Sequence, residues 1–96
     1  MTELTLVSKQ SRPLRPLVEA ALANELRLVH AAIRQTELRL QAFEARYGMT
    51  TEAFIQRFED DELEETLEFV EWVGEYRLLG HLQEKAETFQ GIEIEN

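Results

Sequence analysis

The residues of this chain that could do chemistry are mostly carboxylates, and four glutamates are regularly spaced on one predicted helix. They lie at steps of four, three and four: Glu64, Glu68, Glu71 and Glu75. These steps keep the side chains within about 60° of one another on a helix. Three apolar residues continue the same face: Leu78, Leu82 and Phe89. We call the four glutamates the acidic stripe.

Two interpretations of this face are open besides a metal site. It can be a solvated acidic turn that leads into the protein core. It can also bind a partner, because the glutamates would steer a basic surface while the leucines and the phenylalanine supply buried anchors. The second interpretation makes all seven residues the candidate partner-binding site.

The sequence does not favour a metal centre or a catalytic site. Helical di-iron bundles use a Glu-x-x-His spacing, and neither His30 nor His81 has a glutamate three residues before it. The chain has no cysteine, which excludes disulfides, thiol catalysis and zinc ribbons. Ser8 and Ser11 belong to no hydrolase motif. We expect no enzyme activity, no cofactor and no resident metal.

Charge is distributed unevenly along the chain. The formal net charge is −9, and residues 49–96 carry fourteen of the nineteen acidic side chains. Such a surface repels nucleic acids and lipid headgroups and attracts basic proteins. Arg27 and Arg34 lie seven residues apart; they could contact phosphates, or they could pair with the surplus carboxylates. We expect a basic protein partner, no membrane contact and no direct binding of nucleic acid.

A long helix that must position part of this chemistry is predicted over residues 16–47, with Pro16 suited to its first turn. An apolar seam recurs along it at steps of four and three: Leu22, Leu26, Val29, Ile33, Thr36, Leu40, Phe43 and Tyr47. This is the period of a coiled coil. Arg39 and Arg46 flank this seam together with Glu37 and Glu44, so we expect ion pairs along its edges.

The same helix carries a second stripe on nearly the opposite side. Its members have the same spacing and are mainly small: Leu17, Ala21, Asn24, Leu28, Ala31, Gln35, Leu38 and Ala42. A helix that is apolar on two sides usually has two neighbours. We therefore expect the six apolar members to form an oligomer interface: Leu17, Ala21, Leu28, Ala31, Leu38 and Ala42.

Two further helices are predicted after Gly48, which can close the long helix in a left-handed conformation. Thr50 or Thr51 can cap a short helix over residues 51–59. The next residues, Asp60, Asp61 and Glu62, suit the positive end of a helix dipole, so a third helix is predicted over residues 62–90.

The third helix should pack antiparallel against the first. Its predicted seam is Phe69, Trp72, Tyr76, Leu79, Gln83 and Ala86. Trp72 and Tyr76 could form a stacking platform, but at seam positions they are more often core residues. Gly74 and Gly80 each cost about 1 kcal/mol in a helix interior, which predicts a close neighbour.

Short strands are predicted at both ends of the chain, over residues 2–8 and 92–95. Because the hairpin brings the two ends together, we expect the strands to pair antiparallel, with Leu4, Leu6, Ile92 and Ile94 on an apolar face. Two strands alone are marginal in water. The pair should therefore add to a further sheet, across a dimer or on a partner.

The predicted fold class is mainly α, with one helical-hairpin domain over residues 1–96 and short terminal β-strands. One hairpin covers only one stripe of the long helix, so we expect a homodimer that forms a four-helix bundle. No apolar run of about 18 residues is present, and the first residues lack the pattern of a secretory signal. We expect a cytoplasmic protein.

Two segments resemble a poorly characterised family of small helical prokaryotic proteins, some encoded beside predicted toxins. The first runs from Phe43 through Tyr47-Gly48-Met49 to Phe54, and the second runs from Thr66 through Glu71-Trp72 to Tyr76. The resemblance covers most of the chain, including the terminal Ile92-Glu93-Ile94. It implies an antitoxin-like interaction protein and transfers no catalytic residue.

These observations favour a non-enzymatic protein-binding module. The resemblance implies that it neutralises a basic partner such as a cognate, nuclease-like toxin. One alternative is a homo-oligomeric coiled-coil structural or adaptor protein. A third is a carboxylate-rich bundle that binds metal.

Overall fold

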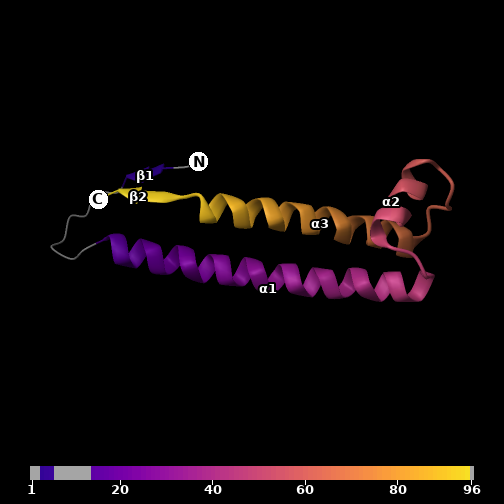
Figure 1. Cartoon of the computed structure of the whole chain (residues 1–96), viewed down its shortest axis with the longest axis horizontal. Coiled ribbons are helices and arrows are strands. Elements are labelled where there is room, and N and C mark those ends of the chain that lie inside the picture. The colour runs from indigo at the N-terminus through magenta and orange to yellow at the C-terminus, as the bar shows by residue number, and fades with distance from the viewer. Residues whose placement is uncertain (1–2, 6–13, 96) are drawn as a thin grey trace.

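The computed structural model describes residues 3–5 and 14–95 of the chain, and the side chains of residues 14–92. The elements are β1 (Glu3–Thr5), α1 (Arg15–Tyr47), α2 (Thr51–Glu59), α3 (Leu67–Gln90) and β2 (Glu93–Glu95). The long helices α1 and α3 pack against each other in an extended hairpin, and α2 lies at its turn (Figure 1). The mainly helical fold and the packing of the two long helices were predicted and are confirmed. The molecule is a rod with extents of 61 × 21 × 18 Å.

Helix α1 ends where the sequence supplies a glycine. Gly48 has a φ of 67°, and its N–H donates to the Glu44 carbonyl. Only glycine adopts this left-handed conformation without steric cost. The chain then turns at once into α2, because Thr50 Oγ1 accepts a hydrogen bond from the Ala53 N–H at 3.1 Å.

Helix α3 begins five residues later than predicted. Asp60 follows the last turn of α2, and Asp61 has a φ of 60°, which interrupts the helical backbone. The cap of α3 is Thr66, whose Oγ1 accepts a hydrogen bond from the Phe69 N–H at 3.1 Å. The acidic residues that looked like the first turn of a helix are therefore a loop between α2 and α3. Leu63 in this loop packs against the core, which needs a chain path that a continuous helix would not give.

The core is concentrated at the α2 end of the rod. Trp72 and Phe54 are fully buried and stack with ring centroids 3.8 Å apart and an interplanar angle of 2°. Leu40 and Val73 complete the buried cluster. Trp72 is therefore a core residue, whereas Tyr76 is 40% exposed.

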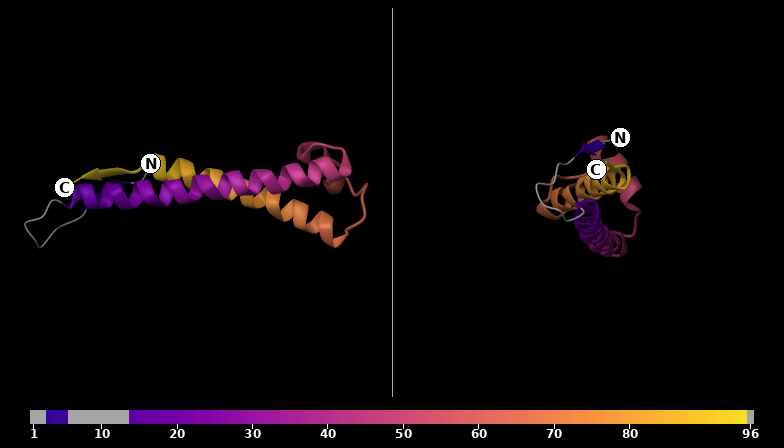
Figure 2. Two further views of the ribbon diagram at one scale, coloured as in Figure 1. Left: turned by 90° about the horizontal axis from the view of Figure 1, so that it is seen from below. Right: turned by 90° about the vertical axis from the view of Figure 1, so that its left-hand side faces the viewer.

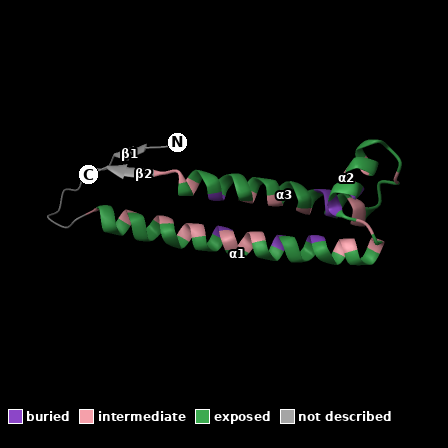
Figure 3. Cartoon of the chain, in the orientation of Figure 1, coloured by how far each residue is buried: buried purple, intermediate pink, exposed green. Residues whose placement is uncertain are grey.

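Toward the other end, the rod is only two helices thick. Val29 and Ala86 are the buried apolar residues there, within the part of the chain whose side chains are described (Figure 3). Thr36 occupies a seam position because its hydroxyl donates to the Ala32 carbonyl at 2.8 Å, which satisfies the buried oxygen. An ion pair between Lys85 and Glu25, 3.6 Å apart, bridges the two helices.

The strands pair in the opposite sense to the prediction. β1 and β2 are parallel, with Glu3 opposite Glu93 and Thr5 opposite Glu95. The predicted antiparallel pairing assumed that β1 continues the direction of α1. Instead β1 runs against α1 and alongside β2 (Figure 1). The β2 strand lies at the end of the rod away from α2 (Figure 2). The rest of the predicted strand 2–8 lies outside the described residues.

No described helix is both long enough and apolar enough to cross a bilayer.

Candidate protein-binding surfaces

The second stripe lies mostly on the side of α1 that faces away from α3, and only Ala42 at its end borders α3. All eight of its members are exposed, including Leu17 (60%), Leu28 (54%) and Leu38 (64%). The predicted oligomer interface is thus an uncovered apolar face about 37 Å long, at 1.5 Å per residue from Leu17 to Ala42. Three leucines in one line on a helix are an unusual surface for a protein that works alone.

The acidic stripe is divided between the hairpin interior and the surface. Glu68 forms an ion pair with Arg46 at 2.7 Å and accepts a hydrogen bond from the Tyr47 hydroxyl. Glu75 forms an ion pair with Arg39 at 3.5 Å. The predicted ion pairs of Arg39 and Arg46 along the seam are therefore present, and α3 supplies their carboxylates. Glu37 and Glu44, predicted beside them, form no ion pair with a described residue, and Glu44 Oε2 instead accepts a hydrogen bond from the Thr51 N–H at 2.7 Å.

The other two members of the acidic stripe, Glu64 and Glu71, are exposed. Glu64 lies in the loop before α3. These two glutamates form no ion pair with a described residue, whereas the other two pair with arginines of α1.

The apolar continuation of the stripe is divided in the same way. Leu78 is 41% exposed, but Leu82 and Phe89 are half-buried. The seven predicted residues therefore do not form one exposed partner-binding face. The physical reason is that α3 is rotated about its own axis relative to the prediction. Glu75 and Leu82 are half-buried at the contact with α1, whereas Tyr76 and Gln83, which were predicted there, are exposed. Positions about 60° apart on a helix cannot be assigned to one face or its edge by spacing alone.

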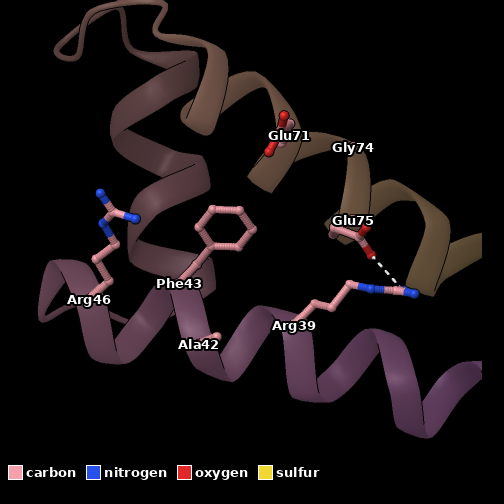
Figure 4. Close-up of a pocket in the computed structure, with 7 residues that line it drawn as sticks. All are labelled: Arg39, Ala42, Phe43, Arg46, Glu71, Gly74 and Glu75. Atoms are coloured by element: carbon pink, nitrogen blue, oxygen red, sulfur yellow. Dashed lines mark ion pairs between the residues drawn. The ribbon is translucent and has the colours of Figure 1, made fainter.

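A groove lies between α1 and α3, with a volume of about 510 Å³. Seven residues line it: Arg39, Ala42, Phe43, Arg46, Glu71, Gly74 and Glu75. Figure 4 shows Phe43 projecting from α1 between the helices, and Arg39 directed toward Glu75. One wall carries two arginines and the other carries two glutamates, so the groove has an apolar floor between rims of opposite charge.

Two features leave this groove open to a further contact. Glu75 Oε2 is buried and accepts no hydrogen bond from any described residue, since its only described partner is Arg39 Nη1 in the 3.5 Å ion pair. A Cβ added to Gly74 would meet nothing within 4 Å. Ala42 belongs both to the groove and to the second stripe, so the two surfaces are continuous. Sequence reasoning missed the groove, although it identified Ala42, Arg39 and Gly74 separately.

The loop between α2 and α3 is the most acidic exposed segment among the described residues. Its five carboxylates are all exposed: Asp60, Asp61, Glu62, Glu64 and Glu65. Glu62 forms an ion pair with Arg57 of α2 at 3.9 Å, and the other four carboxylates form no ion pair with any described residue. We call this segment the acidic loop. The signal for it was in the sequence, but it was interpreted as the start of a helix.

The candidate metal ligands of the described residues are not gathered into one cluster. Within the described part of the chain, no group of three or more His, Cys, Asp or Glu side chains is placed to hold a metal ion. His30 on α1 is half-buried and His81 on α3 is exposed. Arg27 donates a hydrogen bond to Asn24 on its own helix.

Comparison with known proteins gives no further identification, because no family model, no curated protein and no solved structure matches this chain. The resemblance to antitoxin-like proteins therefore stays a prediction.

Proposed function

We propose that this chain is a non-enzymatic protein-binding module that works as a homodimer. The observation that carries the proposal is the second stripe, whose three leucines stay more than half exposed in one chain. Burying such side chains stabilises an association by roughly 25 cal/mol per Å² of apolar surface. A second copy of the chain carries the same apolar stripe, and a two-fold interface is formed by the same residues of both copies.

The shape of the rod supports this proposal. The chain exposes 7153 Å², whereas a compact monomer of this mass exposes about 5,700 Å². A specific interface between two proteins typically buries about 1,200–2,000 Å² in total. The excess of total surface over a compact monomer is therefore comparable with the area that such an interface buries.

The module's partner is a basic protein, and the acidic loop is the surface that meets it. Five exposed carboxylates within seven residues create a local negative field that would accelerate encounter with a positive surface. Together with the resemblance described above, this favours an antitoxin-like protein that covers the nucleic-acid-binding face of a toxin. A coiled-coil adaptor without a toxin is the alternative, and it would use the same dimer.

Self-association can be measured by sedimentation equilibrium at micromolar concentration. We expect the mass of two chains for the wild type and of one chain for Leu28→Glu, with helix content retained because Leu28 does not face α3. Leu67→Glu is the matched control: Leu67 is 76% exposed but lies on α3, outside the second stripe, so this variant should stay dimeric. A wild-type mass of one chain would refute the homodimer.

The partner can be sought as a small basic reading frame adjoining the gene and produced together with this chain. If the two proteins bind, Glu64→Lys with Glu65→Lys should slow association about tenfold and flatten its dependence on salt. Glu84→Lys with Glu87→Lys, two exposed glutamates far along α3, makes the same charge change away from the acidic loop and should have little effect. Equal effects of the two variants would show that association depends on the net charge of the chain and not on the acidic loop. A solitary gene whose product binds no basic protein would favour the adaptor.

A further inference from the structure

We infer that two copies pair through the second stripe in an antiparallel register, with the two-fold axis between Val29 and His30. This inference rests on the proposed homodimer and specifies its geometry. It follows from an order of side-chain sizes in the second stripe that the single hairpin does not use.

The spacing of the second stripe is the same from either end of the helix. The order of its large and small side chains, in contrast, is reversed. Its steps are four, three, four, three, four, three and four, which is a symmetric series. When a second, antiparallel copy is centred on this series, each residue lies opposite the residue of the second copy for which the two numbers add to 59. The four resulting pairs are Leu17 with Ala42, Ala21 with Leu38, Asn24 with Gln35, and Leu28 with Ala31.

Each apolar pair therefore places one leucine opposite one alanine, and the remaining pair places two amides together. Interiors pack at the density of organic crystals, and alternating large and small residues across facing positions is how two surfaces interdigitate. Asn24 and Gln35 can satisfy each other across the interface, because each amide both donates and accepts.

A parallel dimer would pack the same residues badly. Leu28 would meet Leu28 of the second copy, and Ala31 would meet Ala31, so that crowded layers would alternate with empty ones. Voids and overpacked layers each cost roughly 1–3 kcal/mol in packed interiors. The size order therefore selects the antiparallel arrangement.

The structure leaves room for this arrangement. The second stripe is exposed along its whole length, and the proposed axis lies near the middle of α1 (Arg15–Tyr47). Two copies then overlap along almost the entire helix, and the small side chain of Ala42 lets Leu17 of the second copy reach the edge of the groove beside Phe43. The antiparallel pairing also sends the two acidic loops to opposite ends of the dimer.

Flanking charges give the pairing a recognisable dependence on salt. Arg27 and Arg34 are exposed on the same flank of the second stripe, and the antiparallel register brings Arg27 close to Arg34 of the second copy. Like charges weaken the dimer at low ionic strength. Added salt should therefore tighten self-association, whereas it should weaken the complex of the acidic loop with a basic partner.

Cross-linking can test the register, since the chain contains no cysteine. Asn24→Cys and Gln35→Cys would be made separately, mixed in equal amounts and treated with a short thiol-reactive cross-linker. We expect covalent dimers that contain one chain of each variant, and little product from either variant alone. In the antiparallel dimer, two copies of Asn24→Cys hold their thiols eleven residues apart, or about 16 Å along the helix.

A size exchange across the axis provides an independent test. Leu28→Ala and Ala31→Leu should each raise the dissociation constant of the dimer at least about tenfold, through a void and through overpacking respectively. The double variant restores one leucine opposite one alanine and should return the constant to within about threefold of the wild type.

The outcomes separate this inference from the proposed homodimer. Efficient cross-linking of each cysteine variant with itself, or a double variant no better than the single ones, would overturn the antiparallel register while the dimer stands. A monomeric wild type would overturn both.

Discussion

Trp72 on α3 contacts both of the other helices. Its ring is fully buried between Phe54 on α2 and Phe43 on α1, with centroids 3.8 and 5.3 Å away. Its indole Nε1–H donates to Thr51 Oγ1 at 3.1 Å. Thr51 is the first residue of α2 and is itself 4% exposed. One side chain therefore fixes both the position of α2 and the angle at which it enters the core.

Loss of this acceptor should destabilise the fold more than its size suggests. Thr51→Val keeps the shape of the side chain but leaves a buried indole donor without a partner, which costs about 1–3 kcal/mol. Urea unfolding would show this as a lower free energy of unfolding at equal protein concentration. Thr88→Val removes an exposed hydroxyl that donates only to its own helix, so it should change the free energy by less than about 0.5 kcal/mol. Equal effects would show that the hydrogen bond of Trp72 is unimportant.

Sequence reasoning succeeded at residues whose neighbours are implied by the helical repeat. It identified Trp72 as core, and it placed Arg39 and Arg46 at the edge of the seam, where both form ion pairs with α3. It failed to predict that Glu68 and Glu75 lie at the contact between α1 and α3. A carboxylate is expected at the surface, and spacing within one helix does not show that the facing helix carries an arginine at the same level. Thr51 was considered only as a helix cap, since no local signal reveals a tryptophan twenty-one residues away.

At the level of the elements, the glycines of α3 have no neighbour to explain them. A close approach was predicted at Gly74 and Gly80, but a Cβ added at either position would meet nothing within 4 Å among the described residues. In an open helix interior, glycine only adds entropy to the unfolded chain and weakens the helix. These two glycines are therefore destabilising within one chain.

Gly80→Ala should accordingly raise the free energy of unfolding by about 0.5–1 kcal/mol. Gly48→Ala is the instructive contrast, because Gly48 has a φ of 67° and an alanine there should lower the free energy by about 1 kcal/mol. Thermal unfolding of the two variants beside the wild type would measure both. A destabilising Gly80→Ala would contradict this expectation.

The elements themselves were predictable to different degrees. The length of α1 follows from an uninterrupted seam that ends at Gly48, and α2 follows from a threonine cap and two phenylalanines one turn apart. The start of α3 did not follow, because the packing of Leu63 against the core and the positive φ of Asp61 depend on tertiary contacts that helical spacing does not reveal. The direction of β1 did not follow either, since it is set by pairing with β2, whose Glu93 lies ninety residues after its partner Glu3.

On the scale of the whole molecule, packing is uneven along the rod. The aromatic cluster gathers at the α2 end, whereas no residue from 14 to 28 is fully buried. A region with few buried apolar contacts opens at a lower free energy than the rest of the molecule. The hairpin should therefore separate first at the end that holds β1 and β2.

Amide hydrogen exchange can reveal this gradient. We expect the slowest exchange around Phe54 and Trp72 and the fastest in the first turns of α1, within the two long helices and α2. The measurement should be repeated on Leu28→Glu, since a second copy would protect α1 in the wild type. Uniform exchange along both long helices of that variant would show that the hairpin opens as one unit.

The position of the single tryptophan determines which part of the molecule tryptophan fluorescence reports on during unfolding. Trp72 lies in the aromatic cluster at the α2 end, so its emission reports on the unfolding of that end. It does not respond to separation of α1 and α3 at the end that holds β1 and β2. Far-UV ellipticity, in contrast, weighs every helical turn equally. On heating, the ellipticity should begin to fall before the emission shifts to longer wavelength. The gap between the two midpoints would measure how far the helices part before the aromatic cluster unfolds.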